Sequence, residues 1–223
     1  MAQAVLVIAA HMDDEVLGPG ATIARHVEAG DSVAVCIVCQ RAYDHKFEPA
    51  EVEAEKHAAR RAAAVLGYSD LRFLNLRDEL LDERLLDILV PLEACIADVR
   101  PSLVYTHHRG DSNQDHRAVL QASLIGCRSI SRHKVPRVMS YEVPSSTDVA
   151  APFPELAFQP NYYVNVERFL DRKLEAIQAY ERELREFPHP RSVKGLEVLA
   201  QKRGMEVGFL AAEAFVVIRD EWA

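Results

Sequence analysis

Apolar and polar residues follow two different patterns along the chain. Short, continuous apolar runs predict buried strands, and longer segments with apolar residues at every third or fourth position predict helices. The expected strands cover residues 4–9, 32–39, 71–76, 102–106, 137–143 and 214–218. The expected helices cover residues 20–29, 49–66, 82–99, 115–128, 166–185 and 192–203.

This order of elements predicts an α/β fold. Strands separated by helices form a parallel sheet that is covered on both faces, so we expect a doubly wound, mostly parallel sheet with helices on both sides. The chain has no repeat, no low-complexity tract and no shift of composition, which indicates a single domain over residues 1–223. Residues 144–160 contain four prolines and no periodic pattern, as is typical of a long surface loop that often serves as a functional lid.

The charge balance limits the partners that the chain is expected to bind. Its 34 acidic and 26 basic side chains give a formal net charge of -8, which argues against a nucleic acid as the main partner. No apolar run approaches the length of a membrane span. The apolar residues 1–10 lack a basic leader, so we expect a buried strand there, with no signal peptide and no membrane contact.

The four cysteines, at positions 36, 39, 95 and 127, are dispersed and suggest no disulfide framework. This usage favours a reducing, cytoplasmic environment. Cys36 and Cys39 form a C-x-x-C pair, which could bind metal or carry redox chemistry. They lie inside an apolar run, where strand alternation would send their side chains to opposite faces, so buried core thiols are expected instead.

One imidazole and three carboxylates crowd the segment that follows the first expected strand. His11, Asp13, Asp14 and Glu15 lie within five positions. A capping box or an acidic helix start explains one or two of these residues, but not all four. Because adjacent like charges cost free energy, we expect either a cation or strong hydrogen-bond donors to compensate them.

A second polar cluster runs from Tyr105 to His116 and follows the strand expected at 102–106. In a doubly wound sheet, ligands bind above the carboxyl ends of the strands at which the order reverses, so we expect both clusters to meet there. A lone His116 would more often be a packed or helix-terminal residue, and His107 and His108 could merely satisfy loop backbone. The joint occurrence of two clusters favours a site. No role is expected for the other histidines in polar or helical segments, His26, His45, His57 and His133.

Histidine and aspartate ligands with open positions for water match the preference of catalytic zinc. We therefore expect His11, Asp14 and His116 to hold one Zn²⁺ per chain, a place that another divalent metal could also take. Asp13 is left free to accept a proton from water that the metal acidifies. Glu15 and Asp115 are expected to orient the ligands or the backbone around them.

The segment Ala10-His11-Met12-Asp13-Asp14-Glu15 resembles the A-H-P-D-D-E motif of the PIG-L/LmbE-like zinc-dependent deacetylases, and Asp115-His116 resembles the end of their second metal motif. Residues 189–192 and 212–215 resemble further family segments, so the likeness covers nearly the whole chain. The resemblance implies a Rossmann-like fold, the same three zinc ligands and the same base. It also implies removal of an N-acetyl group from an amino sugar or related small metabolite, and assembly into a homo-oligomer.

Two positions depart from the family pattern. Met12 replaces a common proline, which should be tolerated because that side chain does not ligate metal. Asn113 replaces a histidine that serves many members as an acid or as an oxyanion stabiliser. An amide donates a hydrogen bond but cannot deliver a proton, so we expect Asn113 to orient substrate or water. The candidates for protonating the leaving amine are therefore His107, His108, His189 and Asp13 after it has taken the water proton.

Three more residues could contact the substrate, because they fall in loops at the expected strand ends: Arg41, Asp78 and Asp111. Each could instead be a solvated loop charge. Two other functions stay open. The same site could hydrate a carbon–carbon double bond or hydrolyse another amide, since a fold does not fix the chemistry. The chain could also be a non-catalytic sugar- or nucleotide-binding module, although no G-x-G-x-x-G follows the first strand.

Overall fold

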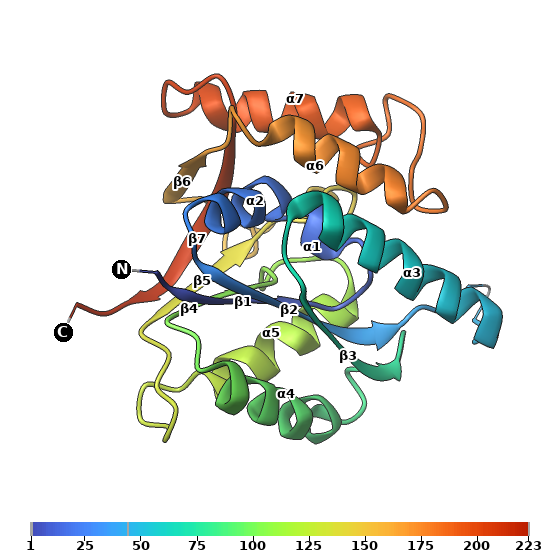
Figure 1. Cartoon of the computed structure of the whole chain (residues 1–223), viewed down its shortest axis with the longest axis vertical. Coiled ribbons are helices and arrows are strands. Elements are labelled where there is room, and N and C mark those ends of the chain that lie inside the picture. Colours follow the sequence, from blue (N-terminus) through green and yellow to red (C-terminus); the bar gives the residue numbers. More distant parts are fainter. Residues whose placement is uncertain (1, 44, 223) are drawn as a thin grey trace.

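The computed structural model describes residues 2–43 and 45–222, and its strands form a seven-stranded sheet (Figure 1). The order across the sheet is β3-β2-β1-β4-β5-β7-β6. The first five strands in this order are parallel, whereas β7 runs antiparallel to both β5 and β6. The strands are β1 (Ala4–Ala9), β2 (Ser32–Gln40), β3 (Asp70–Arg77), β4 (Leu103–Thr106), β5 (Arg137–Tyr141), β6 (Tyr162–Asn165) and β7 (Ala212–Asp220).

Helices cover both faces of the sheet, which confirms the expected α/β architecture. In Figure 1, α4 and α5 lie below the sheet, and α2, α3, α6 and α7 lie above it. Within the described residues, no helix is both long and apolar enough to cross a membrane. The helices are α1 (Asp14–Leu17), α2 (Gly20–Glu28), α3 (Pro49–Leu66), α4 (Leu85–Val99), α5 (Gln114–Gly126), α6 (Leu170–Ala176) and α7 (Val193–Met205), with a 3₁₀ turn η1 (Ile177–Ala179) after α6.

Strand β1 is buried on both faces. Val5 and Val7 pack into the core that includes residues of α2 and α3, whereas Leu6 and Ile8 pack into the core that includes residues of α4. All four side chains are inaccessible to solvent. Because the strand is covered on both sides, the polar residues that follow it begin inside the protein and not at its surface.

The two cysteines of the C-x-x-C pair are buried core thiols, as expected, but they do not lie on opposite faces. Cys36 and Cys39 both pack into the core beside α4. The register between β2 and β3 shifts between Ile37 and Cys39. Such an irregularity changes the face to which the following side chains point, and it returns Cys39 to the face of Cys36.

The helix expected at 166–185 is much shorter than predicted. Only α6 and η1 are helical, and the backbone leaves the helical region at Tyr180, with a ψ of 61°. The Tyr180 side chain is buried and donates a hydrogen bond to Glu15 Oε1 at 2.6 Å. The helical backbone thus ends at the residue whose side chain makes this inward contact.

Two short elements, β6 and α1, were not predicted, because each has four residues and neither shows a clear period. Residues 144–160 contain no helix or strand, which confirms the long loop expected there. The other elements lie where the pattern placed them, with some ends shifted by a few residues.

Candidate metal centre

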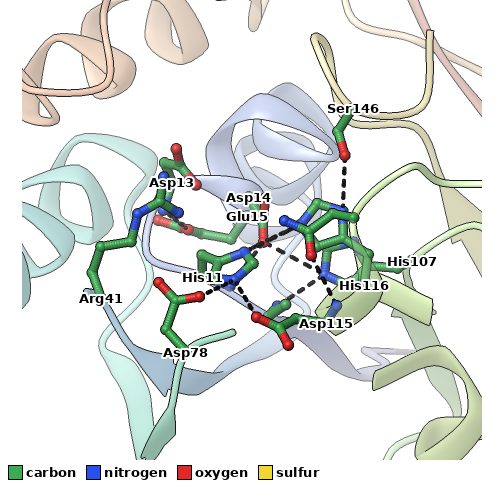
Figure 2. A network of polar contacts seen from close by, with 12 residues as sticks. His11, Asp13, Asp14, Glu15, Arg41, Asp78, His107, Asp115, His116 and Ser146 are labelled. Atoms are coloured by element: carbon green, nitrogen blue, oxygen red, sulfur yellow. Dashed lines mark hydrogen bonds and ion pairs between the residues drawn. The ribbon is translucent and has the colours of Figure 1, made fainter. Parts of the chain in front are cut away.

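Two polar loops meet at the carboxyl ends of adjacent strands. β1 and β4 pair in parallel, with Val5 opposite Leu103 and Val7 opposite Tyr105. The loops after these strands therefore emerge at the same edge of the sheet. Figure 2 shows the side chains of both loops turned toward one another at this edge. The structure thus brings together the two clusters that the sequence singled out.

Three atoms of these loops form a nearly equilateral triangle. His11 Nδ1 lies 3.3 Å from Asp14 Oδ2 and 3.2 Å from His116 Nε2, and the last two atoms are 3.3 Å apart (Figure 2). All three residues are buried, with at most 2% of their surface exposed. Tetrahedral zinc with bonds of about 2.0–2.1 Å places its ligand atoms about 3.3–3.4 Å apart. The spacing of these atoms therefore matches three corners of such a site.

Carboxylates on the outer side of each ring fix which nitrogen faces the triangle. His11 Nε2 lies 3.2 Å from both Asp78 Oδ1 and Asp115 Oδ2. His116 Nδ1 lies 3.1 Å from Asp111 Oδ2. Since an ionised carboxylate only accepts hydrogen bonds, the ring protons belong on these outer nitrogens. The inner nitrogens then point their lone pairs at the triangle, as metal-ligating histidines do.

The centre of the triangle favours positive charge. Two imidazole lone pairs and a carboxylate oxygen repel one another at 3.2–3.3 Å unless a cation lies between them. Burial alone would lower the pKa of His11, yet the carboxylates of Asp115, Asp14 and Asp78 raise it well above its usual value. The other oxygen of Asp14, Oδ1, is buried without a hydrogen-bond partner among the described residues. This donor set and its charge fit a divalent metal such as zinc.

Asp13 lies beside the triangle and keeps one oxygen free. Its Oδ2 accepts a hydrogen bond from Arg191 Nη1 at 3.2 Å, whereas its Oδ1 is buried and has no partner in the part of the chain that the structure describes. Burial raises the pKa of Asp13 to about 7, against the opposing charge of Arg191. Its φ of 127° is a strained backbone conformation for a residue with a side chain. A buried carboxylate with a pKa near neutrality is suited to proton transfer.

A network of charged groups fixes the other side of Asp13. Arg191 also donates from Nη1 to Glu183 Oε2 at 2.8 Å and from Nε to Ser145 Oγ at 2.6 Å. Arg41 Nη2 donates to the same Glu183 oxygen at 3.0 Å. Two guanidinium groups therefore lie close to Asp13 and Glu183, and each carboxylate has a cation beside it.

Glu15 holds the backbone of this segment. Its Oε2 accepts from the backbone N–H of Asp13 at 3.1 Å, and its Oε1 accepts from the Tyr180 hydroxyl. Burial raises the pKa of Glu15 to about 8. Asp115, the other residue expected in a supporting position, accepts from the backbone N–H groups of Glu79 and Leu81 in addition to contacting His11.

Asn113 and His107 have structural contacts on the β4 side of the site. Asn113 caps α5, and its Oδ1 accepts from the backbone N–H of Asp115 at 2.8 Å. The His107 ring stacks on His116 with 4.0 Å between centroids, and its Nε2 accepts from the Ala10 N–H at 2.8 Å. Burial lowers the pKa of His107 to about 3. His107 is therefore a neutral ring that packs against a candidate ligand.

The remaining two histidine candidates are engaged by loop backbone. His108 Nε2 lies 3.1 Å from the carbonyl oxygen of Leu156, in the loop at 144–160. His189 Nδ1 accepts from the backbone N–H of Arg191 at 3.1 Å, so it supports the residue that contacts Asp13.

Several residues near the centre were not identified from the sequence. Ser146 Oγ and Thr147 Oγ1 donate to Asp111, which contacts His116 in turn. Arg191 and Glu183 are more than 160 positions from Asp13. Ser146 and Thr147 lie in the long loop at 144–160, and Arg191 lies in the family-like segment 189–192, but neither signal assigned a role to an individual residue.

A buried triangle of donor atoms, with the Asp13 carboxylate beside it at the switch point of a doubly wound sheet, defines an α/β protein with a candidate catalytic metal centre. Residues 6–125 match the family model described as GlcNAc-PI de-N-acetylase, PIG-L. The chain belongs to this family of deacetylases, which confirms the resemblance that the motifs carried.

Known proteins show how far this likeness extends. The uncharacterized deacetylase YaiS of Escherichia coli K12 is 31% identical over 182 residues, which cover 79% of this chain and 89% of YaiS. The N,N'-diacetylchitobiose deacetylase of Pyrococcus horikoshii has a TM-score of 0.79 at 18% identity, covering 98% of this chain and 84% of its own. The 4-carboxy-2-hydroxymuconate hydratase GalB of Pseudomonas putida has a TM-score of 0.74 at 21% identity, covering 100% of this chain and 98% of its own. Proteins named for two different reactions therefore share this fold.

Proposed function

We propose that this protein is a zinc-dependent N-deacetylase that releases acetate from an N-acetylated amino sugar or a related small metabolite. The observation that carries the proposal is the donor triangle with the free oxygen of Asp13 beside it. Membership of a deacetylase family supports the hydrolytic chemistry. Deacetylation of a sugar by the Pyrococcus protein of the same fold supports the substrate class.

His11, Asp14 and His116 would hold the zinc ion. Zinc bound there would polarise the amide carbonyl and make a nearby water molecule more acidic. The protein's own part begins with Asp13, whose free Oδ1 accepts the water proton as the water attacks the carbonyl carbon. Arg191 holds the other oxygen in place, so that Oδ1 keeps its orientation.

We further propose that Asp13 returns this proton to the leaving amine. Asn113 has no proton to deliver, and its amide oxygen caps α5. Because burial raises the pKa of Asp13 to about 7, this residue can both take up and release a proton near neutral pH. His107 remains neutral and buried, and His108 and His189 each have one ring nitrogen engaged by backbone.

Addition of water to a carbon–carbon double bond is the competing reaction, since the Pseudomonas hydratase shares the fold. The test is a screen of metal-loaded protein against N-acetylated amino sugars and unsaturated carboxylic acids. Acetate and free amine are measured for the first set, and loss of the double-bond absorbance for the second. We expect acetate release that a chelator abolishes and added zinc restores.

Two other outcomes of this screen would favour a different function. Loss of absorbance from an unsaturated acid without acetate release from any acetylated compound would favour the hydratase. A protein that holds no stoichiometric metal, even after addition of zinc, would favour a binding module without catalysis.

A further inference from the structure

A cavity of about 350 Å³ lies at the opposite end of the sheet from the metal centre. Its wall includes Leu103 and Arg137, the first residues of β4 and β5, whereas the metal centre follows the carboxyl ends of β1 and β4. Residues of α2 and β6 also line it. This volume is at the small end of the range for ligand pockets, which is about 300–1,000 Å³. The proposed deacetylation makes no use of it.

A chain of three hydrogen-bonded side chains lines this cavity. Asp31 Oδ2 lies 2.6 Å from His26 Nδ1, and His26 Nε2 lies 3.0 Å from the Tyr105 hydroxyl. Asp31 Oδ1 accepts from the backbone N–H of Gln3 at 2.8 Å. Both oxygens of the one carboxylate in the wall are therefore occupied within the protein.

Donors in the wall are less fully used. Arg137 donates from Nε to Asp220 Oδ1 at 2.9 Å, and Arg25 donates from Nη1 to the carbonyl oxygen of Asn165 at 2.5 Å. Each guanidinium carries five N–H groups, so most of them remain for another partner. Thr22 also lines the cavity, and its hydroxyl is buried without a partner among the described residues, although only 1% of the residue is exposed.

The rest of the wall is largely aromatic or apolar. Tyr162 and Phe209 are partly exposed, whereas Tyr105, Met139 and Leu103 are buried. Surplus N–H donors from two arginines would bind an anionic group, and the aromatic and apolar side chains would pack against a flat body.

We infer that this cavity is a second ligand site, and that it binds a small carboxylate with an aromatic or apolar body. Arg137 and Arg25 hold the carboxylate, Thr22 supplies a further donor, and Tyr162 and Phe209 pack against the body. The site is separate from the metal centre, so its occupation does not depend on bound metal.

Calorimetric titration with benzoate tests this inference, with benzamide as an uncharged probe of the same shape. We expect benzoate to bind about tenfold or more tightly than benzamide, because the charge strengthens its hydrogen bonds. Arg137→Gln should weaken benzoate binding by about tenfold. Thr22→Val should weaken it without lowering the melting temperature, since the hydroxyl has no partner among the residues that the structure describes. The exposed Arg84, which pairs with Asp87, provides the control, and Arg84→Gln should leave the affinity unchanged.

A second control separates this cavity from the metal centre, because carboxylates also bind zinc. Benzoate should still bind to His116→Ala, which lacks a candidate metal ligand. Binding that is lost in His116→Ala but retained in Arg137→Gln would place the anion on the metal and overturn the inference. Equal affinity for benzamide, or no binding of benzoate to the wild-type protein, would overturn it as well.

Discussion

The two halves of the metal centre carry buried carboxylates, but they balance the charge in opposite ways. Around His11 and His116, four aspartates approach two imidazole rings: Asp14, Asp78, Asp111 and Asp115. Around Asp13, the carboxylates lie beside the guanidinium groups of Arg191 and Arg41. The imidazole rings of the first half carry a charge only when they are protonated, which fits a site for a bound metal, whereas the second half contains the permanent charges of two arginines.

This difference indicates that the two halves of the site have different roles. Lone pairs that converge without a built-in cation are suited to holding a metal. Asp13 has an arginine on one oxygen and, within residues 2–43 and 45–222, no partner on the other, which suits it to moving a proton. Variants in the first half should therefore affect metal content, and variants in the second should affect turnover of metal-loaded protein.

The largest effect is expected from removing a candidate ligand. His116→Ala deletes one corner of the triangle, so the protein should lose stoichiometric zinc and all measurable acetate release. Elemental analysis of the purified protein measures the metal. His57→Ala, at an exposed position of α3, is the control and should keep one zinc per chain. A fully zinc-loaded His116→Ala would contradict the assignment.

Asp13→Asn tests the half of the site in which the carboxylates lie beside arginines. The amide keeps the size of the side chain but cannot take a proton, so the deacetylation rate should fall by about 10²–10⁴-fold. Zinc content should stay at one ion per chain, because Asp13 is not a corner of the triangle. If the variant turned over at the wild-type rate, another group would have to be the base.

Asp111→Asn should have an intermediate effect on the metal. Its Oδ2 lies 3.1 Å from His116 Nδ1 and fixes the orientation of that ring. Loss of such a supporting carboxylate lowers metal affinity by about 10–100-fold. Competition with a fluorescent zinc chelator measures the change. Affinity equal to that of the wild type would show that His116 is held by its packing alone.

Arg191→Gln should give the smallest effect, as a shift of the pH profile. Arg191 opposes the burial that raises the pKa of Asp13, so its removal should raise that pKa further. Asp13 must be ionised to accept a proton, and the acid limb of the rate profile should therefore move up by about one pH unit. Arg182→Gln, which removes an exposed arginine paired with Glu51, should leave the profile in place. A downward shift in Arg191→Gln would exclude the proposed interaction.

The metal half of the site could be predicted because its residues lie in two short segments, each directly after a buried strand. The two segments meet because their strands, β1 and β4, are neighbours in the sheet. The likeness to a family motif implies the same three ligands. Asp78 was expected near the site for the same reason, since it follows β3. Its contact with His11 depends on the loop conformation, which the pattern of apolar residues does not specify.

The proton-transfer half could not be predicted in the same way. Arg191 and Glu183 lie in irregular segments beside α7 and after η1, and their approach to Asp13 depends on how that part of the chain packs. The helix predicted through Tyr180 shows the same limit. That helix ends at Tyr180, whose hydroxyl donates a hydrogen bond to the distant Glu15, and no local pattern contains this contact.

Zinc K-edge absorption fine structure of the zinc-loaded protein tests the central assignment most directly. We predict two imidazole nitrogens and carboxylate or water oxygens at about 2.0–2.1 Å from the zinc ion. A spectrum with sulfur ligands, or one without imidazole nitrogens, would contradict this assignment.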